Sequence, residues 1–549
     1  MRCDVFDRVS TWKPLGDYRK AVAAALLLLF AFQGAQAVRT MSCTADETHY
    51  LAMGSYLLKT RNWDLDDALL HPPLSYYLHS LALLAEPIDY RTFQIRDMNE
   101  RGRVLMDSAP DDHLLHLARL PVLMLATLLG FLVLAWGWQA CGPAAGLGAL
   151  FLYVFNPTIL SNAALITPDL CLTLFSTLTF YLLWRYLRRP GWMLLLATGG
   201  ALGLTLLSKY SGILVVIALL LISALQRFRR HNLTGILGFR QLAIVLLLAL
   251  LVVDAGYFFC DTFHFLDGAG FRSHLFQSLA HTGLFHVIPL PLPRAYVMGI
   301  DWQYTIAENG FGYFMFGKVA QHGWIFYYLV AFLLKSPVPF VVLTAMSLVV
   351  RVRDDDSRTL RLVLLVPAAI FLMYFSLASV SRGLRYLLPI FPLLFVWIVP
   401  VTLRRCRKSR FLRVAAVALA LWYAWGSLRI APHYLAYFNE LCGGPNNGYK
   451  LLHESEFDWG QGLKELREYL DARGIKHVQL GYFGTADPAH YGIHYDPLPC
   501  DRTWAWRKEE PIAVSATALY WDCNRWLLQL EPSDKVGYTI FIYNVPRTH

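Results

Sequence analysis

Charged side chains are scarce in this sequence. Asp, Glu, Lys and Arg make up 16% of its 549 residues, whereas hydrophobic residues make up 56%. An average soluble domain has about 25% charged residues. The deficit excludes an ordinary soluble globule and indicates a protein that crosses a membrane several times.

Several motifs are also missing. The chain has no CxxC and no HExxH pattern, which excludes the tight zinc sites that these spacings build. It has no motif for RNA or DNA binding, no low-complexity segment and no clear internal repeat. The net charge of +10 does not indicate a nucleic-acid partner, because the basic residues gather in short segments between apolar runs, as they do in cytoplasmic loops.

The sequence does contain a long series of apolar runs. A membrane-spanning helix needs roughly 20 apolar residues, and about eleven runs approach this length. The first follows a basic segment and has features of a signal peptide, but its length and the later runs favour an uncleaved span. The expected spans cover 21–38, 113–137, 143–164, 168–187, 191–208, 210–225, 241–260, 324–350, 362–378, 386–403 and 411–430.

Clusters of basic residues predict the orientation of these spans. With eleven spans, every cluster falls on the same side as the N-terminus, and the positive-inside rule makes that side cytoplasmic. The three long polar segments, 39–112, 261–323 and the tail from about 431, are then exoplasmic. The clusters lie at 185–189, 227–240, 351–361 and 404–413.

The hydrophilic tail at 431–549 is expected to form a small α/β domain beside the transmembrane domain at 1–430. Cys500 and Cys523 fall in this tail, and on an exoplasmic side they could form a disulfide, although spacing alone does not fix the geometry. The patterns predict helices at Leu463–Ala472 and Ala518–Leu530, and strands at Val478–Phe483, Ile512–Ser515 and Tyr538–Tyr543.

Asp46 and Glu47, directly after the first span, are the main candidates for chemistry. Two carboxylates are poor anchors for a helix at the membrane surface. In low-dielectric surroundings the pKa of a carboxylate rises, which makes it a better general base. Inverting glycosyl transfer needs such a base, to take the proton from an acceptor hydroxyl as it attacks the anomeric carbon. The alternative is a solvated pair that caps a helix next to the membrane.

His71-Pro72-Pro73 follows in the same polar segment. Proline fixes its own φ and restricts the residue before it, so His71 is expected to be extended. In that setting His71 could contact a phosphate or a sugar hydroxyl. The alternative is that the two prolines simply start a helix.

Other polar residues recur where spans end on the exoplasmic side. Ionisable residues near a membrane are costly, and those that face a cavity usually serve function. Cations there suit an anionic lipid headgroup, because a guanidinium binds phosphate oxygens well. The alternative for each cation is snorkelling at the interface. The candidates for binding donor or acceptor are Asp169, Lys209, Lys335, Arg382, Arg385 and Tyr386.

Short motifs follow one another along nearly the whole chain. They are Asp46-Glu47-Thr48-His49-Tyr50, His71-Pro72-Pro73-Leu74, Asn156-Pro157 with Asp169, His322-Gly323-Trp324, Leu334-Lys335-Ser336-Pro337, Arg382-Gly383-Leu384-Arg385-Tyr386, Tyr437-Phe438-Asn439-Glu440 and Asp458-Trp459-Gly460-Gln461. In this order they resemble the glycosyltransferase family 39 type. Those enzymes use polyprenyl-phosphate sugars, are related to protein O-mannosyltransferases and to the aminoarabinose transferases of lipid A, and share the GT-C fold.

The resemblance implies a mainly α-helical inverting glycosyltransferase in a bacterial inner membrane. It would move a monosaccharide from a polyprenyl-phosphate donor to an exoplasmic protein, lipid or polysaccharide, with its N-terminus cytoplasmic and its C-terminal domain periplasmic. Asp46 would be the catalytic base, and Glu47 would support it or orient the acceptor. Asp169 matches a second acidic position of the family, near the active site.

One position departs from the lipid A branch, whose members usually carry Lys before the two prolines where this chain has His71. Family members differ in metal use, and the sequence has no compact ligand cluster, so the cofactor stays open. Two other classes compete with the transferase. A transporter or lipid flippase would place ionisable residues inside its spans and show internal repeats. A non-catalytic scaffold would bind glycan through its tail.

Overall fold

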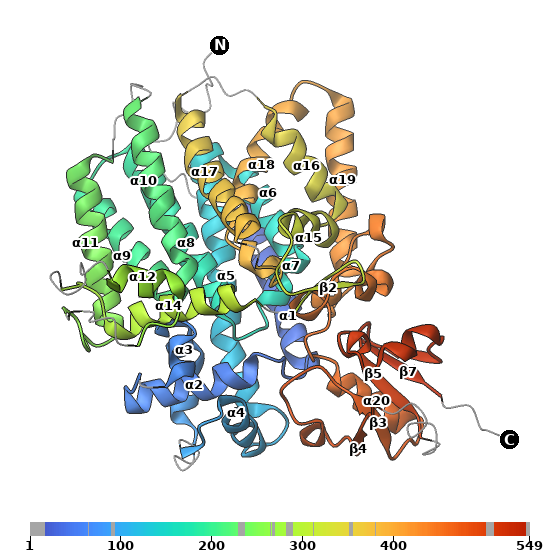
Figure 1. Ribbon diagram of the computed structural model, residues 1–549. Coiled ribbons are helices and arrows are strands. Elements are labelled where there is room, and N and C mark those ends of the chain that lie inside the picture. Colours follow the sequence, from blue (N-terminus) through green and yellow to red (C-terminus); the bar gives the residue numbers. More distant parts are fainter. Residues whose placement is uncertain are drawn as a thin grey trace.

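Long helices form a bundle, and polar segments gather at one end of it in this computed structural model (Figure 1). Some of the predicted basic residues lie outside the described residues. They are Arg229, Arg230, Arg351, Arg353 and the N-terminal basic residues before 17. The structure describes residues 17–63, 65–88, 94–228, 237–263, 265, 270–281, 289–310, 312–350, 355–378, 380–500 and 510–544.

Helices occupy every apolar run that is predicted to cross a membrane. In the described chain, seven helical segments have the length and composition for this. They are α1 (Asp17–Thr40), α5 (His113–Cys141), α8 (Pro168–Arg188), the segment Tyr210–Arg227 that contains most of α10 (Ile213–Phe228), α11 (Phe239–Gly256), α17 (Asp355–Leu377) and α19 (Arg410–Leu428). The other runs hold α6 (Pro143–Val154), α9 (Trp192–Ser208), α15 (Tyr327–Lys335), α16 (Val338–Leu348) and α18 (Ile390–Cys406). The protein is therefore a multi-pass membrane protein, and the number of eleven spans stays a prediction.

Two breaks divide the apolar segments, one within the run that is predicted as a single span at 324–350 and one between the runs predicted at 191–208 and 210–225. Ser336 is extended, with ψ 142°, because Pro337 follows it, and the run at 324–350 is divided into α15 and α16. The Asn439 side-chain amide donates to the Ser336 carbonyl at 2.9 Å and satisfies it. Lys209 is likewise extended, with φ −160° and ψ 145°, between α9 and the short helix η4 (Tyr210–Gly212). Each break leaves a lysine at a helix end.

Small residues allow the bundle helices to approach closely. Gly199 and Gly203 lie one turn apart on α9, against α11. A Cβ atom at Gly203 would lie 2.5 Å from the Val252 Cβ atom and 2.9 Å from the Ala249 carbonyl oxygen. Glycine at these positions therefore permits backbone contact of the kind that joins helices in membranes, where no hydrophobic effect drives association.

The polar segments between the spans form short elements at the lower end of the bundle in Figure 1. The segment at 39–112 contains α2 (Glu47–Thr60), α3 (Pro73–Ser80) and α4 (Met98–Asp107), which pack on one another. The segment at 261–323 contains α12 (His274–His281), α14 (Arg294–Asn309) and an antiparallel pair, β1 (Tyr313–Met315) and β2 (Lys318–Ala320). Most of the predicted site residues lie at this end.

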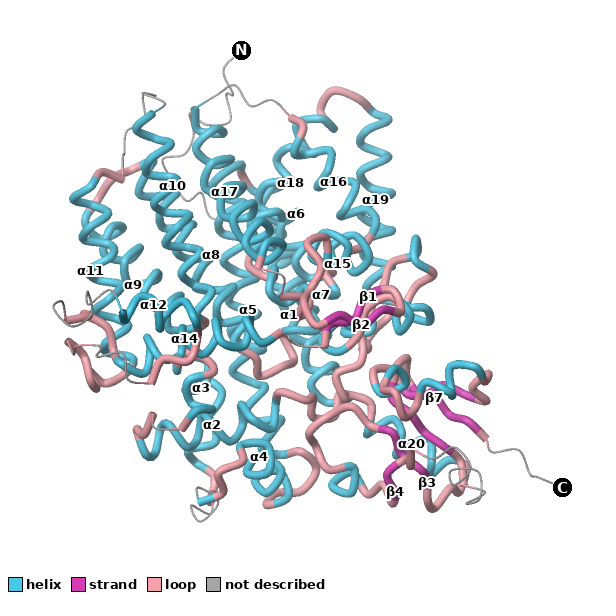
Figure 2. The backbone as a smooth tube through the Cα atoms, viewed as in Figure 1, coloured by secondary structure: helices cyan, strands magenta, loops and turns pink. Residues whose placement is uncertain are grey.

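The tail contains the predicted α/β unit (Figure 2). Its five-stranded sheet has the order β4-β3-β5-β7-β6, in which β4, β3 and β5 are parallel, and β7 is antiparallel to β5 and β6. Helix α20 and strand β5 have the predicted bounds, and Cys500 and Cys523 form a disulfide. The elements are α20 (Leu463–Ala472), β3 (Val478–Gly481), β4 (Tyr495–Pro497), β5 (Ile512–Ser515), β6 (Asp534–Val536) and β7 (Ile540–Tyr543).

The helix predicted at Ala518–Leu530 is wrong. Two short 3-10 turns, Ala518–Tyr520 and Arg525–Gln529, occupy this segment. The buried Asn524 side chain donates at 3.0 Å to the Ala518 carbonyl, which an α-helix would use for its own ladder. The neighbouring Cys523 forms a disulfide with Cys500.

The tail is joined to the segment that follows α1. The backbone amides of Ser42 and Ala45 donate to the carbonyls of Gln461 and Trp459, at 3.1 and 2.9 Å. The Thr485 hydroxyl donates to the Ala45 carbonyl at 2.6 Å. These bonds fix the backbone directly before Asp46 against the C-terminal domain.

Polar side chains form a second junction of this domain, with the connection between α4 and α5. The His490 Nδ1 and Nε2 atoms lie 2.8 and 3.2 Å from carboxylate oxygens of Asp107 and Asp112. Hydrogen bonds to Asp112, and then to Asp107, raise the pKa of His490 although burial opposes this. The Tyr491 hydroxyl and Lys464 also contact Asp112, at 3.0 and 2.8 Å.

We expect His490→Ala to loosen this junction more at about pH 6 than at about pH 9. A histidine whose folded pKa is raised stabilises fully below its unfolded pKa of about 6.5, and the contribution is lost as the pH rises through the folded value. Hydrogen exchange over residues 485–495 at both pH values measures the effect. The exposed His494, changed to Ala, is the matched control. An equal loss of protection at both pH values would contradict the prediction.

Candidate active site

Asp46 lies where the chain turns from α1 into α2, at the N-cap position of α2. Its side chain accepts no hydrogen bond from the helix backbone, so it does not cap the helix as the alternative requires. The carboxylate instead accepts from Arg385 Nη1 at 3.2 Å, and 37% of the Asp46 side chain is exposed. Asp46 therefore has an ionised partner and remains open to a ligand.

Glu47 is fully buried and points into the bundle. Arg119 of α5, also 0% exposed, donates to both of its oxygens, from Nε at 3.0 Å and from Nη2 at 2.5 Å. The backbone amides of Thr44 and Ile166 donate to the same carboxylate, at 2.9 and 3.1 Å. The remaining Arg119 donors bind the carbonyls of Val38, Met41 and Ser42. Glu47 thus holds the turn that carries Asp46, and its oxygens are occupied by protein donors.

Three of the other predicted residues join Asp46 in one charged cluster. Asp169, in the first turn of α8, accepts from Lys209 Nζ at 2.6 Å and lies 3.9 Å from Arg385 Nη1. Asp169 is 1% exposed, so it serves as the buried counter-ion of both cations. Along the order Asp46, Arg385, Asp169, Lys209 the charges alternate in sign. Each cation therefore lies beside a carboxylate, which restricts its movement.

Two aromatic rings lie against these cations. Lys209 Nζ is 3.7 Å from the centre of the Tyr386 ring, and the Arg385 guanidinium is 4.3 Å from the centre of the Trp459 ring. Cation–π contacts of this kind position a cation without using its hydrogen-bond donors. The sequence predicts Tyr386 as a site residue, whereas it indicates Trp459 only as part of the motif at 458–461.

The other predicted cations have different surroundings. Lys335 is buried and donates to the carbonyls of Leu435 and Glu456, so it ties the end of α15 to the C-terminal segments. It lines one small cavity together with Arg385. Arg382 lies beside Tyr313 of β1 and has a hydrogen bond with it. Arg382 is thereby joined to the polar segment at 261–323.

His71 lies beside α2, buried, with Nε2 at 3.1 Å from the Tyr50 hydroxyl and its ring stacked on Tyr50. Burial, with Lys209 nearby, holds the pKa of His71 well below its usual value. The imidazole is therefore neutral and adds no positive charge to the site. Its Nδ1 atom is buried without a hydrogen-bond partner among the described residues. The prolines do start a helix, because α3 begins at Pro73.

Glu454 lies near the charged cluster and was not among the residues that the sequence predicts for the site. Burial, together with the nearby Asp46 carboxylate, raises the pKa of Glu454 to about 7. The neighbouring Glu456 accepts from the Leu384 amide and so positions the turn that carries Arg385. The missed signal is the acidic run at 454–458, directly before the Trp459 motif.

A group of side chains with metal-binding chemistry lies apart from this cluster. Among the described residues, one group has the ligand types and closeness for a metal ion: His477, Asp496 and Glu510. Asp496 lies on β4, His477 and Glu510 lie just before β3 and β5 of the same sheet, and none of them is a predicted site residue.

The chain resembles known glycosyltransferases. Residues 24–267 match the family model described as dolichyl-phosphate-mannose-protein mannosyltransferase, which confirms the resemblance expected from the motifs over this part of the chain. No curated protein matches the sequence.

One solved structure confirms the fold class, and two others are less similar. The apo structure of ArnT from Cupriavidus metallidurans is 11% identical, covers 96% of this chain and 97% of that chain, and has a TM-score of 0.51. AglB from Archaeoglobus fulgidus, solved with an inhibitory peptide and a dolichol-phosphate, is 12% identical over 98% and 75%, with a TM-score of 0.43. The Pmt1-Pmt2 complex of S. cerevisiae, bound to its sugar donor, is 20% identical over 45% and 33%, with a TM-score of 0.33. The likeness to ArnT shows a GT-C fold.

We expect Glu47→Ala to destabilise the protein strongly and Asp46→Ala to leave it folded. Removing Glu47 leaves the buried Arg119 without a counter-ion, a defect that typically costs about 3–5 kcal/mol. Asp46, the adjacent residue, is partly exposed and is the matched control. Thermal unfolding of both variants in lipid nanodiscs measures the difference. Equal unfolding midpoints would show that Glu47 does not hold this turn.

Proposed function

We propose that the protein is an inverting membrane glycosyltransferase that moves a monosaccharide from a polyprenyl-phosphate donor to an exoplasmic acceptor. The observation that carries the proposal is the cluster of Asp46, Arg385, Asp169 and Lys209. It combines an accessible carboxylate with two held cations where the chain leaves the bundle. The family match over residues 24–267 supports the donor class, because this range includes Asp46, Asp169 and Lys209.

Asp46 is the general base of the proposed reaction. It takes the proton from an acceptor hydroxyl while the hydroxyl oxygen attacks the anomeric carbon from the face opposite the phosphate. The bond between that carbon and the phosphate oxygen breaks, and its electron pair leaves with the polyprenyl phosphate. The products are the glycosylated acceptor and the lipid phosphate, with the proton on Asp46. Exposure of the Asp46 side chain suits this role, since the acceptor must reach it.

Arg385 and Lys209 stabilise the leaving phosphate. Negative charge grows on the phosphate oxygens as the glycosidic bond breaks, and cations that are already in place stabilise that charge without reorganisation. Asp169 is the positioning residue, because its buried carboxylate contacts both cations. Arg382 adds further positive charge from the same turn as Arg385. Lys335 supports the turn that carries these two arginines through its contacts with the C-terminal segments.

The distribution of charge favours a transferase over a transporter or flippase. The cluster lies at helix ends and turns, whereas transporters often place their ionisable sites near the membrane midplane. The bonds between 42–45 and 459–461 also connect the C-terminal domain to the turn that carries Asp46, which a separate glycan-binding scaffold would not need.

The proposed orientation places the cluster on the exoplasmic, periplasmic side of a bacterial inner membrane. Basic segments that the structure describes lie close together. Arg188 of α8 pairs with Asp356 of α17 at 3.5 Å. Arg404 of α18 donates to Ser357, the next residue of α17, at 2.8 Å. These contacts support one basic face. The positive-inside rule makes that face cytoplasmic.

We expect Asp46→Asn to lose sugar transfer by at least about 100-fold while donor binding persists, since a general base contributes about 10²- to 10⁴-fold. Purified protein in nanodiscs would receive a panel of radiolabelled polyprenyl-phosphate sugars with membrane extract as acceptor. Asp111→Asn, at an exposed aspartate after α4, is the matched control. Normal transfer by Asp46→Asn would refute the assignment of the base. If the wild type and both variants transfer no sugar from any donor, the result counts against the proposed function.

The raised pKa of Glu454 predicts a pH effect on donor binding. Glu454 is neutral below about pH 7 and carries a negative charge above it, which opposes an anionic donor beside Arg382 and Arg385. We expect the KM for the donor to rise severalfold between about pH 6 and about pH 8 in the wild type. In Glu454→Gln, which stays neutral, the KM should change little. The same rise in both proteins would exclude Glu454 as its cause.

A further inference from the structure

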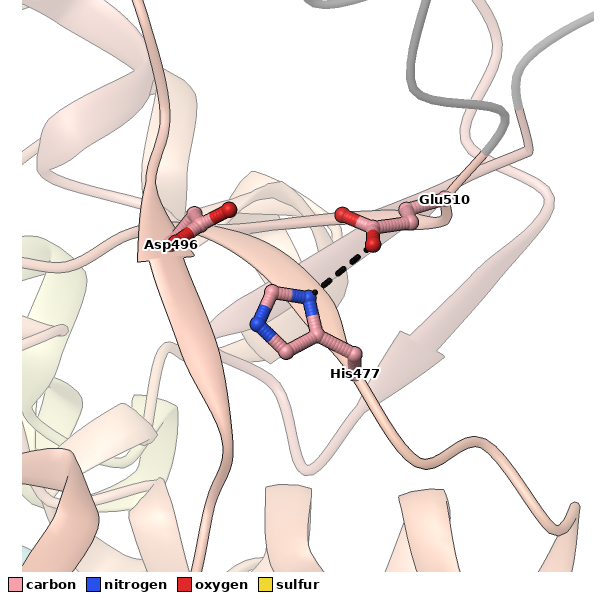
Figure 3. Close-up of side chains that lie close together, drawn as sticks. All are labelled: His477, Asp496 and Glu510. Atoms are coloured by element: carbon pink, nitrogen blue, oxygen red, sulfur yellow. Dashed lines mark ion pairs between the residues drawn. The ribbon is translucent and has the colours of Figure 1, made fainter.

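The sheet of the C-terminal domain brings one histidine and two carboxylates together at one end of its parallel strands (Figure 3). His477 directly precedes β3, Asp496 lies on β4 and Glu510 lies just before β5. One ligand atom from each residue can be chosen so that all three atoms lie within 4.8 Å of one another. The three side chains point toward a common space in the figure.

The register of the sheet explains why these residues meet. Gln479 of β3 lies opposite Asp496 on one neighbouring strand and Ile512 on the other. Residues two apart along an extended chain point to the same face. His477 is two residues before Gln479, and Glu510 is two residues before Ile512. Glu510 therefore lies opposite His477, about one strand spacing away. Asp496, which is opposite Gln479, lies on the other neighbouring strand two residues further along, on the same face and diagonal to the histidine.

Two buried polar atoms of this group, one on His477 and one on Glu510, lack a hydrogen-bond partner among the described residues. His477 Nδ1 and Glu510 Oε1 are 3.1 Å apart, yet Nδ1 has no hydrogen-bond partner among the described residues. Glu510 Oε2 is also buried without a hydrogen-bond partner in the described chain. Atoms that are hidden from water and lack partners are costly, so a ligand at this point would be stabilising.

We propose that His477, Asp496 and Glu510 bind a divalent cation of the zinc class. An imidazole nitrogen with two carboxylate oxygens is a donor set for Zn²⁺, with water in the fourth position. Tetrahedral bonds of about 2.0–2.2 Å place ligand atoms roughly 3.4 Å apart. Side-chain rotations that move these atoms by about an ångström therefore bring them to bonding distance of one ion. Calcium is disfavoured because it requires six to eight oxygen ligands.

The ion would act as a clip on the sheet. It would join the ends of three parallel strands that are otherwise held by short ladders, because β3 and β5 have four residues each and β4 has three. The His477 and Glu510 side chains are 37% and 30% exposed, which leaves an entry path for the ion. This role is separate from sugar transfer, and its test does not depend on activity.

Metal binding by the full-length protein in nanodiscs tests the proposal. EDTA-treated protein would be dialysed against Zn²⁺, with the bound metal measured by mass spectrometry, and against Co²⁺, with its visible absorption as the readout of nitrogen–oxygen ligation. The variants are His477→Ala and the conservative Glu510→Gln, and His494→Ala is the control at an exposed histidine on the same sheet edge. Circular dichroism establishes that each variant is folded.

We expect wild type and His494→Ala to bind one more equivalent of Zn²⁺ than His477→Ala, or to bind it at least about 10-fold more tightly. Glu510→Gln should weaken binding in the same direction, which keeps the test valid if His477→Ala does not fold. Zinc should also raise the unfolding midpoint of the wild type more than that of the variants. Equal zinc stoichiometry and affinity in all four proteins, or stronger binding of Ca²⁺ than of Zn²⁺, would overturn the proposal.

Discussion

The buried ion pair between Glu47 and Arg119 is the interaction on which the site depends. Burying two charges is costly, and the cost is offset only when both are fully hydrogen-bonded. Here the guanidinium binds the carboxylate twice and uses its other donors on the carbonyls of 38–42. One arginine of α5 therefore fixes both the end of α1 and the start of α2. Asp46 lies between them, and its direction follows from that constraint.

The adjacent carboxylates have opposite environments, and the roles proposed for them differ accordingly. Glu47 is at the centre of a closed network, whereas Asp46 has one cation and access to solvent. A carboxylate that is saturated with donors is a poor base and a good structural counter-ion. An accessible carboxylate beside cations that can hold a phosphate is suited to accept a proton from a sugar acceptor. The same contrast separates Lys335, which is held by carbonyls, from Lys209, which lies in the cluster.

The cluster is assembled from ends of elements that are distant in the sequence. Asp46 follows α1, Asp169 begins α8, Lys209 follows α9 and Arg385 lies in a turn before α18. Helix interiors cannot present polar groups to lipid, so a membrane enzyme collects its chemistry where helices begin, end or break. The C-terminal domain completes this arrangement, because Trp459 and Glu456 reach back to Arg385 and its turn.

Much of this was accessible from the sequence, for a physical reason. Apolar runs, prolines and glycines act locally, so the helices, the break at Lys209 and most elements of the tail could be predicted. Charge and order of motifs also led to Asp46, Asp169, Lys209 and Arg385. Only the tertiary structure decided which carboxylate is buried, because the choice rests on Arg119, 72 residues from Glu47. It likewise decided that Ala518–Leu530 is not a helix, that Glu454 lies near Asp46, and that three neighbouring strands bring His477, Asp496 and Glu510 together. These outcomes depend on long-range contacts and burial, which no local pattern encodes.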